Sequence, residues 1–224
     1  MSRLELLKEL AAFILAKHSG QPLLVAIDGM DTSGKSRLSA DLAGILKESQ
    51  RQILTVSLDG FHHPKKIRYR QGEFSALGCY EDSFNLPALI DLVLDPLIPG
   101  GSRKIKRRIF DYTMDQPVRS NWKSVSEDSI LLLDGLYLQR HELNHYWDVR
   151  ILLEIDPEVS IQHAIQRDLF YYGREETVRR KYLERYLPAY QLYRKRCHPQ
   201  KHADVVIENS NWREPVVRFQ KTIA

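Results

Sequence analysis

The chain has 224 residues, of which 43% are hydrophobic and 28% are charged, a composition typical of a globular enzyme with one sizeable core. The formal net charge of +4 does not by itself indicate nucleic-acid binding, because the basic cluster at 103–108 is not interleaved with aromatic residues and no helix-turn-helix or RNP string appears. Cys79 and Cys197 lie far apart, so we expect neither a disulfide framework nor a zinc site, and a reducing cytoplasm fits.

The N-terminal segment predicts an amphipathic helix over 2–18. It has no uninterrupted apolar region and no small-residue cleavage site, which argues against a signal peptide. The longest apolar runs, such as 130–133, are far shorter than a bilayer requires. We therefore expect a cytoplasmic protein with neither a membrane nor a nucleic-acid partner. The oligomeric state stays open, a homo-oligomer included.

Beyond this helix, apolar strands alternate with helical patterns. The expected strands are 22–28, 52–59, 130–135, 148–156 and 203–209, with a strand-like stretch at 104–112, and the expected helices are 35–49, 86–94, 157–172 and 175–195. This order predicts a single α/β domain over 1–224, with a mostly parallel sheet and helices on both faces. The stretch 60–84 shows neither the helical nor the strand period of apolar residues, as is typical of functional or mobile segments.

Residues 29–36 form a phosphate-loop motif. Their sequence, Gly-Met-Asp-Thr-Ser-Gly-Lys-Ser, completes the pattern G-x-x-x-x-G-K-[ST] between the first expected strand and the next helix, a context that argues against a chance glycine-rich turn. Lys35 would reach the β- and γ-phosphates, and the Ser36 hydroxyl would ligate Mg²⁺. The motif predicts the three-layer sandwich of a P-loop NTPase. The residues expected to bind ATP are Gly29, Asp31, Thr32, Ser33, Gly34, Lys35, Ser36 and Arg37.

Three carboxylates occupy expected carboxyl ends of strands and should converge there. Asp134 follows an apolar strand and precedes a glycine, so it resembles a position that holds Mg²⁺, although a strand-end cap is the alternative. Asp59 could accept a proton from an attacking hydroxyl, against the same alternative. Asp28 precedes the phosphate loop and could simply orient it.

The segment 59–84 is the expected acceptor-binding insertion. His62 and His63 do not predict a metal pair, because adjacent residues of an extended chain point to opposite sides and no third ligand is suitably spaced. A substrate contact from one of them is the better interpretation. The stretch 68–70 is either an exposed basic loop or a substrate clamp.

An arginine-rich segment at about 167–185 predicts a small helical lid. Arginines donated from a closing lid stabilise the charge of a transferred phosphoryl group, and closure excludes water. Arg167 and Arg174 are the candidates, with a break at Gly173 between two helical patterns. A surface helix with solvated charges is the alternative.

Together these motifs resemble the uridine kinase and phosphoribulokinase group of P-loop kinases over about 21–210. Besides the phosphate loop, the matching strings are DGFH (59–62), EDSFNL (81–86), FDY (110–112), RDLFYYGR (167–174) and ADVVI (203–207). The resemblance implies that Asp59 is the catalytic base and that Asp82 and Phe84 lie near the acceptor. The chain departs from the pattern at Asp134, where the family often carries Glu, and in its histidine- and arginine-rich stretch 62–70.

The prediction is an ATP- and Mg²⁺-dependent kinase that phosphorylates a small-molecule hydroxyl, first of all the 5′-hydroxyl of uridine or cytidine. Catalysis is assigned to Asp59, Lys35, Arg167 and Arg174, and the metal to Ser36 and Asp134. Acceptor binding is assigned to Phe61, His62, Arg68, Asp82, Phe84 and Asp111. The alternatives are another acceptor, such as nicotinamide riboside or pantothenate, and a nucleotide-hydrolysing switch protein.

Overall fold

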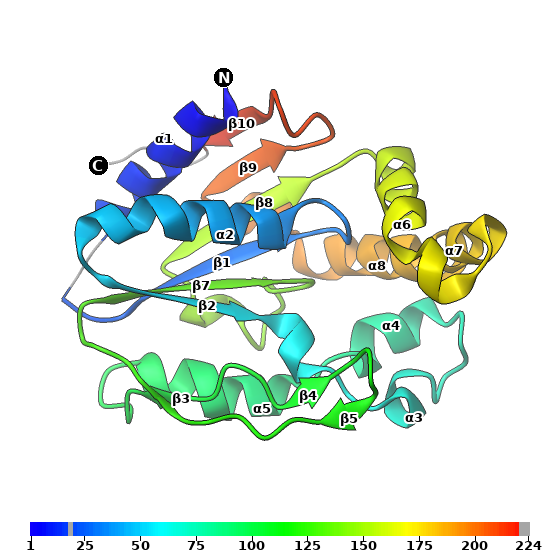
Figure 1. Cartoon of the computed structure of the whole chain (residues 1–224), viewed down its shortest axis with the longest axis horizontal. Helices are drawn as coiled ribbons and strands as arrows, with labels where there is room; N and C mark the ends of the chain where they lie inside the picture. Colours follow the sequence, from blue (N-terminus) through cyan, green and yellow to red (C-terminus); the bar gives the residue numbers. More distant parts are fainter. Residues whose placement is uncertain (18–19, 220–224) are drawn as a thin grey trace.

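A six-stranded sheet forms the centre of the protein (Figure 1). The computed structural model describes residues 1–17 and 20–219. The strand order is β10-β9-β8-β1-β7-β2, all parallel except β10, which runs antiparallel to β9. The bounds are β1 (Leu23–Gly29), β2 (Gln52–Ser57), β7 (Ser129–Gly135), β8 (Val149–Glu154), β9 (Val205–Glu208) and β10 (Val216–Phe219). The expected α/β class is confirmed, and β10 is a strand that the sequence patterns missed.

Helices cover both faces of the sheet, as the three-layer prediction requires. In β1, Leu23, Val25 and Ile27 belong to the core beneath α1 (Arg3–Leu15) and α2 (Lys35–Leu46). Leu24 and Ala26 belong to the core of the opposite face, together with residues of α8 (Leu187–Cys197). Because successive strand residues point to opposite faces, the continuous apolar run of β1 is buried on both sides.

The N-terminal helix is shorter than expected. Ser2 and Glu5 form a reciprocal capping box that begins α1, and the helix ends at Leu15, before the undescribed residues 18–19. Arg3 donates to the Asp41 carboxylate of α2 at 2.8 Å, which ties the two helices together. A 3₁₀ helix over Lys47–Ser49 completes the pattern predicted for 35–49.

The segment after β2 is more ordered than its pattern predicted. It contains a 3₁₀ helix (Leu58–Phe61), α3 (Lys65–Arg68) and α4 (Ala76–Asp82). The strand ends at Ser57, so Asp59 lies in the 3₁₀ turn instead of at the strand end. The pattern at 86–94 forms α5 (Leu86–Leu89) and a π-helix (Ile90–Leu94), followed by a 3₁₀ helix (Asp95–Leu97).

The strand-like stretch 104–112 was predicted wrongly as one element. It holds two separate strands, β3 (Lys104–Ile105) and β4 (Phe110–Asp111). These pair outside the main sheet with β6 (Lys123–Ser124) and β5 (Gln116–Pro117), respectively. The basic residues 106–108 between them interrupt the apolar alternation that a longer strand would need.

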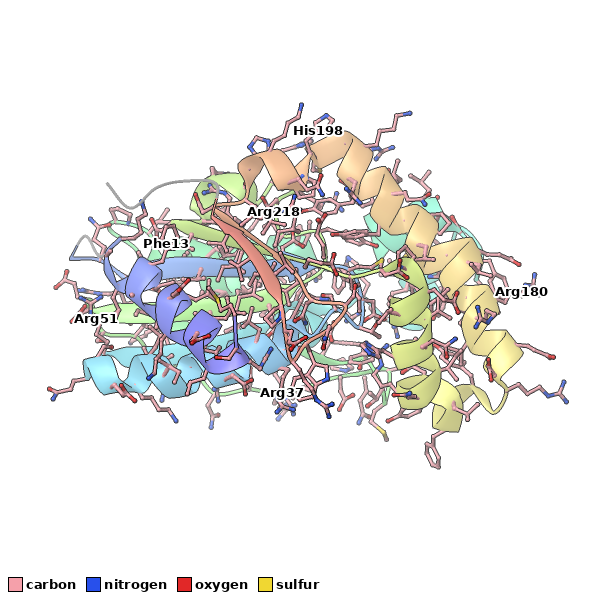
Figure 2. The ribbon with its side chains drawn as sticks, turned by 90° about the horizontal axis from the view of Figure 1, so that it is seen from above. Phe13, Arg37, Arg51, Arg180, His198 and Arg218 are labelled. Atoms are coloured by element: carbon pink, nitrogen blue, oxygen red, sulfur yellow. The ribbon has the colours of Figure 1, made fainter. Side chains whose placement is uncertain are left out.

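The C-terminal helices form a corner beside the carboxyl ends of the strands. Asp156 caps α6 (Pro157–Tyr172), and Gly173, with a φ of 72°, ends it before α7 (Glu175–Lys181). A π-helix (Tyr182–Tyr186) joins α7 to α8, so the helix predicted at 175–195 is three segments. We call α6, α7 and this π-helix the α6–α7 corner. It projects at the end of the molecule that carries Arg180, away from Phe13 of α1 (Figure 2).

Two short helices complete the fold, a 3₁₀ helix over Asn144–Tyr146 and α9 (Pro199–His202). Within residues 1–17 and 20–219, no helix has the length and apolar character needed to span a bilayer.

Candidate active site

The phosphate loop turns sharply between β1 and α2. A Cβ on Gly29 would lie 2.3 Å from the Leu153 carbonyl oxygen, and Gly34 has a φ of +91°, so both positions require glycine. The Lys35 side chain is buried inside the loop, where its Nζ donates to the Met30 carbonyl at 2.6 Å. The loop therefore curls around the lysine at the N-terminus of α2, an arrangement suited to an anion.

Two cavities meet in front of this loop. The first, which we call the loop hollow, measures about 360 Å³ and is lined by the phosphate loop together with Ser57, Asp134 and His163. The second, the side cavity, measures about 610 Å³, and many of its lining residues are aromatic. Asp31, Asp59, Leu136 and Arg167 line both. These four residues thus mark the junction at which two bound molecules could meet.

A third hollow also lies against the loop and shares part of its lining with the loop hollow. It measures about 260 Å³ and is lined in part by Gly34, Arg37, Asn209 and Trp212. The Arg37 guanidinium lies 6.0 Å from the centre of the Trp212 ring. Planar groups of this kind can stack on a purine.

Ser36 and Asp134 face each other in the loop hollow. The Ser36 hydroxyl donates to Asp134 Oδ2 at 2.8 Å, and the Ser57 hydroxyl reaches the same oxygen at 3.2 Å. Burial raises the pKa of the Asp134 carboxyl, and the Ser36 hydrogen bond opposes that shift. Hydroxyl and carboxylate oxygens suit Mg²⁺, which keeps waters and phosphate oxygens as its other ligands. No group of three or more His, Cys, Asp or Glu residues that could hold a metal by itself occurs in the described part of the chain.

Asp59 lies at the junction with its carboxylate open to the cavities. About half (51%) of its side-chain surface is exposed, but the enclosing walls raise its pKa, and the charge of Asp31 raises it further. Lys35 and Arg167 oppose this shift. A carboxylate with a raised pKa between two cavities is suited to accepting a proton.

Aromatic rings form one wall of the side cavity. The His62 ring stacks on Tyr112 with a centroid distance of 4.9 Å, and it lies 4.4 Å from the centroid of Phe84. Burial lowers the pKa of His62 to about 4, so its imidazole is neutral near pH 7. Arg68, also in the wall, donates to Asp115 at 3.0 Å. The wall can therefore stack on a flat ring and still present polar groups.

Some predicted acceptor residues lie elsewhere. Phe61 is fully buried in the core, and Asp82 is buried where it accepts hydrogen bonds from Arg70 and Gln71. Asp111 accepts from the Thr113 backbone and hydroxyl and so shapes the turn after β4. None of Phe61, Asp82 and Asp111 lines the three cavities, whereas His62, Arg68 and Phe84 line the side cavity.

Two other candidates lie away from the cavities. Arg174 is exposed at the start of α7 and lines none of the three. Asp28 lies beneath the loop, where its carboxylate accepts from the Gly29 N–H at 2.7 Å and from Gln139 at 3.2 Å. Its position fits the orienting role that the sequence suggested.

The sequence patterns missed the tyrosine wall. Tyr182, Tyr186 and Tyr190 line the side cavity from the π-helix and α8. Their four-residue spacing was the available signal, because residues at i and i+4 share one helix face. Asp168, which follows Arg167 directly, also lines this cavity, and no sequence pattern indicated it.

Comparison with known proteins decides the family. Residues 24–214 match the model of the family described as "Phosphoribulokinase / Uridine kinase family". The chain belongs to this family. The expected resemblance is thereby confirmed, and P-loop kinases share its fold.

Individual relatives differ in their named acceptors. The chain is 24% identical over 193 residues to a pantothenate kinase of Corynebacterium diphtheriae, covering 85% of this chain and 57% of that protein. It is 24% identical over 199 residues to uridine-cytidine kinase 2-B of Danio rerio, covering 84% of this chain and 73% of that protein. The chain thus spans only about half the length of the pantothenate kinases that it matches.

A solved structure shows the same fold. A possible uridine kinase from Bacillus stearothermophilus has a TM-score of 0.70 and 23% sequence identity to the chain. The similarity covers 89% of this chain and 96% of that one.

Proposed function

We propose that this protein transfers the γ-phosphoryl group of ATP to a hydroxyl of a small molecule, the 5′-hydroxyl of uridine or cytidine being the first candidate. The main support for this proposal is the position of Asp59, which lines both the loop hollow and the side cavity. A hydroxyl bound in the side cavity would meet the triphosphate at this carboxylate. The relatives named for uridine and cytidine support the choice of acceptor.

In this proposal the loop hollow binds the triphosphate. Backbone N–H groups of the loop and the N-terminus of α2 face the phosphates, and the Lys35 ammonium exchanges the Met30 carbonyl for phosphate oxygens. Ser36 and Asp134 would hold Mg²⁺, which neutralises phosphate charge when bound with ATP. The adenine would occupy the third hollow, beside Arg37 and Trp212.

The side cavity receives the acceptor. The neutral His62 ring, with Tyr112 and Phe84, offers a surface on which a pyrimidine can stack. Asp59 then accepts the hydroxyl proton while the oxygen attacks the γ-phosphorus. The tyrosines of the α6–α7 corner narrow the cavity and help exclude water, which would otherwise compete as acceptor.

Pantothenate is the second candidate acceptor. Its carboxylate would find the cations Arg68 and Lys181 in the same cavity, and several relatives carry the name pantothenate kinase. Aromatic stacking favours a nucleoside, whereas these cations favour an organic acid. Nicotinamide riboside, which carries a flat ring and a ribose, is a further candidate for the stacking wall.

The test is ATP consumption across a panel of acceptors. Uridine, cytidine, nicotinamide riboside and pantothenate are compared with a control that lacks an acceptor, using the full chain and its Lys35→Ala variant. We expect a nucleoside to stimulate ADP release well above the control and Lys35→Ala to abolish that stimulation. Steady hydrolysis that no acceptor stimulates would instead favour a nucleotide-hydrolysing switch.

A further inference from the structure

The Asp31 carboxylate ties the phosphate loop to the α6–α7 corner. It accepts a two-pronged contact from Arg167 of α6, with Nη1 at 3.1 Å from Oδ1 and Nη2 at 2.9 Å from Oδ2. The Tyr182 hydroxyl, at the start of the π-helix, donates to Oδ2. The backbone N–H of Thr32 donates to Oδ1 at 2.9 Å. One side chain of the loop thus binds two separate parts of the corner, which lies beside the carboxyl end of β1 in Figure 1.

These contacts use the accepting capacity of Asp31. An ionised carboxylate offers about four lone-pair positions, and Asp31 receives four donors. Burial would raise its pKa, but the charges of Arg167 and Lys35 hold that pKa well below its usual value, so the group is ionised. Asp31 has no free position for a substrate hydroxyl, and its charge would repel a phosphate. The motif suggested that Asp31 contacts ATP directly. These hydrogen bonds favour a different role.

Arg167 is held from a second side as well. Its Nε donates to Asp168 Oδ1 at 2.7 Å and its Nη2 to Asp168 Oδ2 at 2.8 Å. Among the described residues, four of the five guanidinium N–H groups thus have carboxylate partners, and the fifth is on Nη1. Two carboxylates on two edges of a planar fork restrict its rotation. The arginine is consequently held in place at the junction of the two cavities.

We propose that Asp31 is a positioning residue, which holds the Arg167 guanidinium at the junction of the loop hollow and the side cavity and affects the transferred phosphoryl group only through that arginine. The inference rests on the proposed phosphoryl transfer. In this proposal Asp31, the third residue of the phosphate loop, acts by binding a side chain of the α6–α7 corner. Tyr182 holds the same carboxylate from a second position.

A double-mutant cycle tests this role. Asp31→Asn removes the charge and places an amide where Arg167 and Tyr182 need an acceptor. We expect kcat to fall about 10- to 100-fold while the KM for ATP stays within about threefold, since an aligned transition-state contact is lost. In an Arg167→Ala background, Asp31→Asn should change kcat less than about twofold, because residues that act through one another are not additive.

A second variant and a matched control guard against a folding defect. Tyr182→Phe removes one donor to Asp31 and one acceptor of Arg167 Nη2, at 3.3 Å, without changing a loop residue. It should lower kcat about threefold or more, again only while Arg167 is present. Glu158→Gln is the control, because Glu158 makes the same two-pronged pair with Arg179, at 2.9 and 3.1 Å, within the same corner but outside the three cavities. Its kcat should equal that of the wild type.

The cycle is run with uridine as acceptor and, separately, on ATP hydrolysis without an acceptor. The second readout does not depend on the acceptor, so a wrong acceptor and a wrong role for Asp31 give different results. The proposal is overturned if Asp31→Asn lowers kcat by the same factor with and without Arg167. It is also overturned if the variant raises only the KM for ATP, which would indicate a direct contact with the nucleotide.

Discussion

Two charged side chains of the loop hollow, Asp59 and Lys35, have pKa values that their surroundings shift. Asp59 and Lys35 both lie in surroundings that disfavour their ionised forms, the pKa of the acid being raised and that of the ammonium lowered by burial. The Lys35 and Arg167 charges oppose the shift of the Asp59 pKa, and the carboxylates of Asp31, Asp59, Asp28 and Asp134 oppose the shift of the Lys35 pKa. Such shifts are common where a protein arranges groups for proton transfer.

Asp59→Asn tests the general base. A positioned base contributes about 10²–10⁴-fold to rate, so we expect a kcat loss in that range. ATP affinity should change little, because the amide keeps the shape of the side chain and Lys35 and Ser36 are untouched. Single-turnover transfer and equilibrium ATP binding measure the two quantities. Wild-type turnover in the variant would rule out the assignment.

His62 should make the stability of the fold depend on pH. Its pKa is about 4 in the folded protein, below the value of 6.5 for a free histidine, so between these values the unfolded chain binds more protons. Stability is therefore full above about pH 6.5 and is lost as the pH falls towards 4, by up to about 3 kcal/mol.

His62→Phe keeps an aromatic ring and removes the titration. Urea denaturation at pH 7 and pH 5 gives the unfolding free energies of wild type and variant. Between pH 7 and pH 5 the wild type should lose more stability than the variant. Equal differences at the two pH values would show that the imidazole is not buried as a neutral group.

The α6–α7 corner owes its shape to local signals. Asp156 accepts from the Glu158 and Val159 N–H groups at the start of α6, and Gly173 ends the helix in the left-handed conformation. The π-helix that follows brings Tyr182 and Tyr186 to the side cavity. Segments of this kind often occur at functional sites. The corner therefore places one arginine at the junction and leaves another, Arg174, on the surface.

Arg167→Ala and Arg174→Ala form a matched pair of tests. Removing a donor that stabilises developing charge costs about 10²–10³-fold, which we expect for Arg167. We expect less than about tenfold for Arg174, because it reaches the cavities only if the corner closes further. Single-turnover transfer measures both. Equal losses would indicate a closed state in which Arg174 also touches the phosphoryl group.

A buried carboxylate beneath the phosphate loop connects the central sheet to α8. Asp28 of β1 accepts from Gln139, which follows β7, and from the Tyr193 hydroxyl of α8. The same Tyr193 oxygen accepts from the Gln139 backbone N–H at 3.1 Å. This network joins the sheet to the helical layer directly behind the site, so the position of the loop depends on the packing of α8.

Tyr193→Phe should destabilise the protein. It leaves a buried carboxylate and a buried N–H each short of one partner, at a cost of about 1–3 kcal/mol. Tyr190→Phe is the matched control, because Tyr190 lies one turn earlier and its buried hydroxyl has no hydrogen-bond partner among the described residues. Urea denaturation should show a clear loss for the first variant and little or none for the second. Equal effects would contradict the importance of the network.

Local patterns were sufficient for the fold class and for locating the phosphate loop. The alternation of strands and helices, the loop at 29–36 and the break at Gly173 each depend on residues close together in the chain. The resemblance to the family also depended on short strings, and the match over residues 24–214 confirms it. Where these signals were weak, as at 104–112 and 216–219, element predictions were wrong or missing.

The lining of the side cavity became known only from the folded structure. Asp82 and Phe84 are two residues apart in the same motif. The Asp82 carboxylate nevertheless accepts from Arg70, whereas the Phe84 ring lines the side cavity. Asp31 and Arg167 are 136 residues apart, and no periodicity or spacing links them. Backbone propensities and hydrophobic periods act over a few residues, whereas the partner of a polar side chain depends on how distant elements pack. The phosphate loop could therefore be identified from its own residues, while the groups that meet its third residue became known only from the packing of the α6–α7 corner.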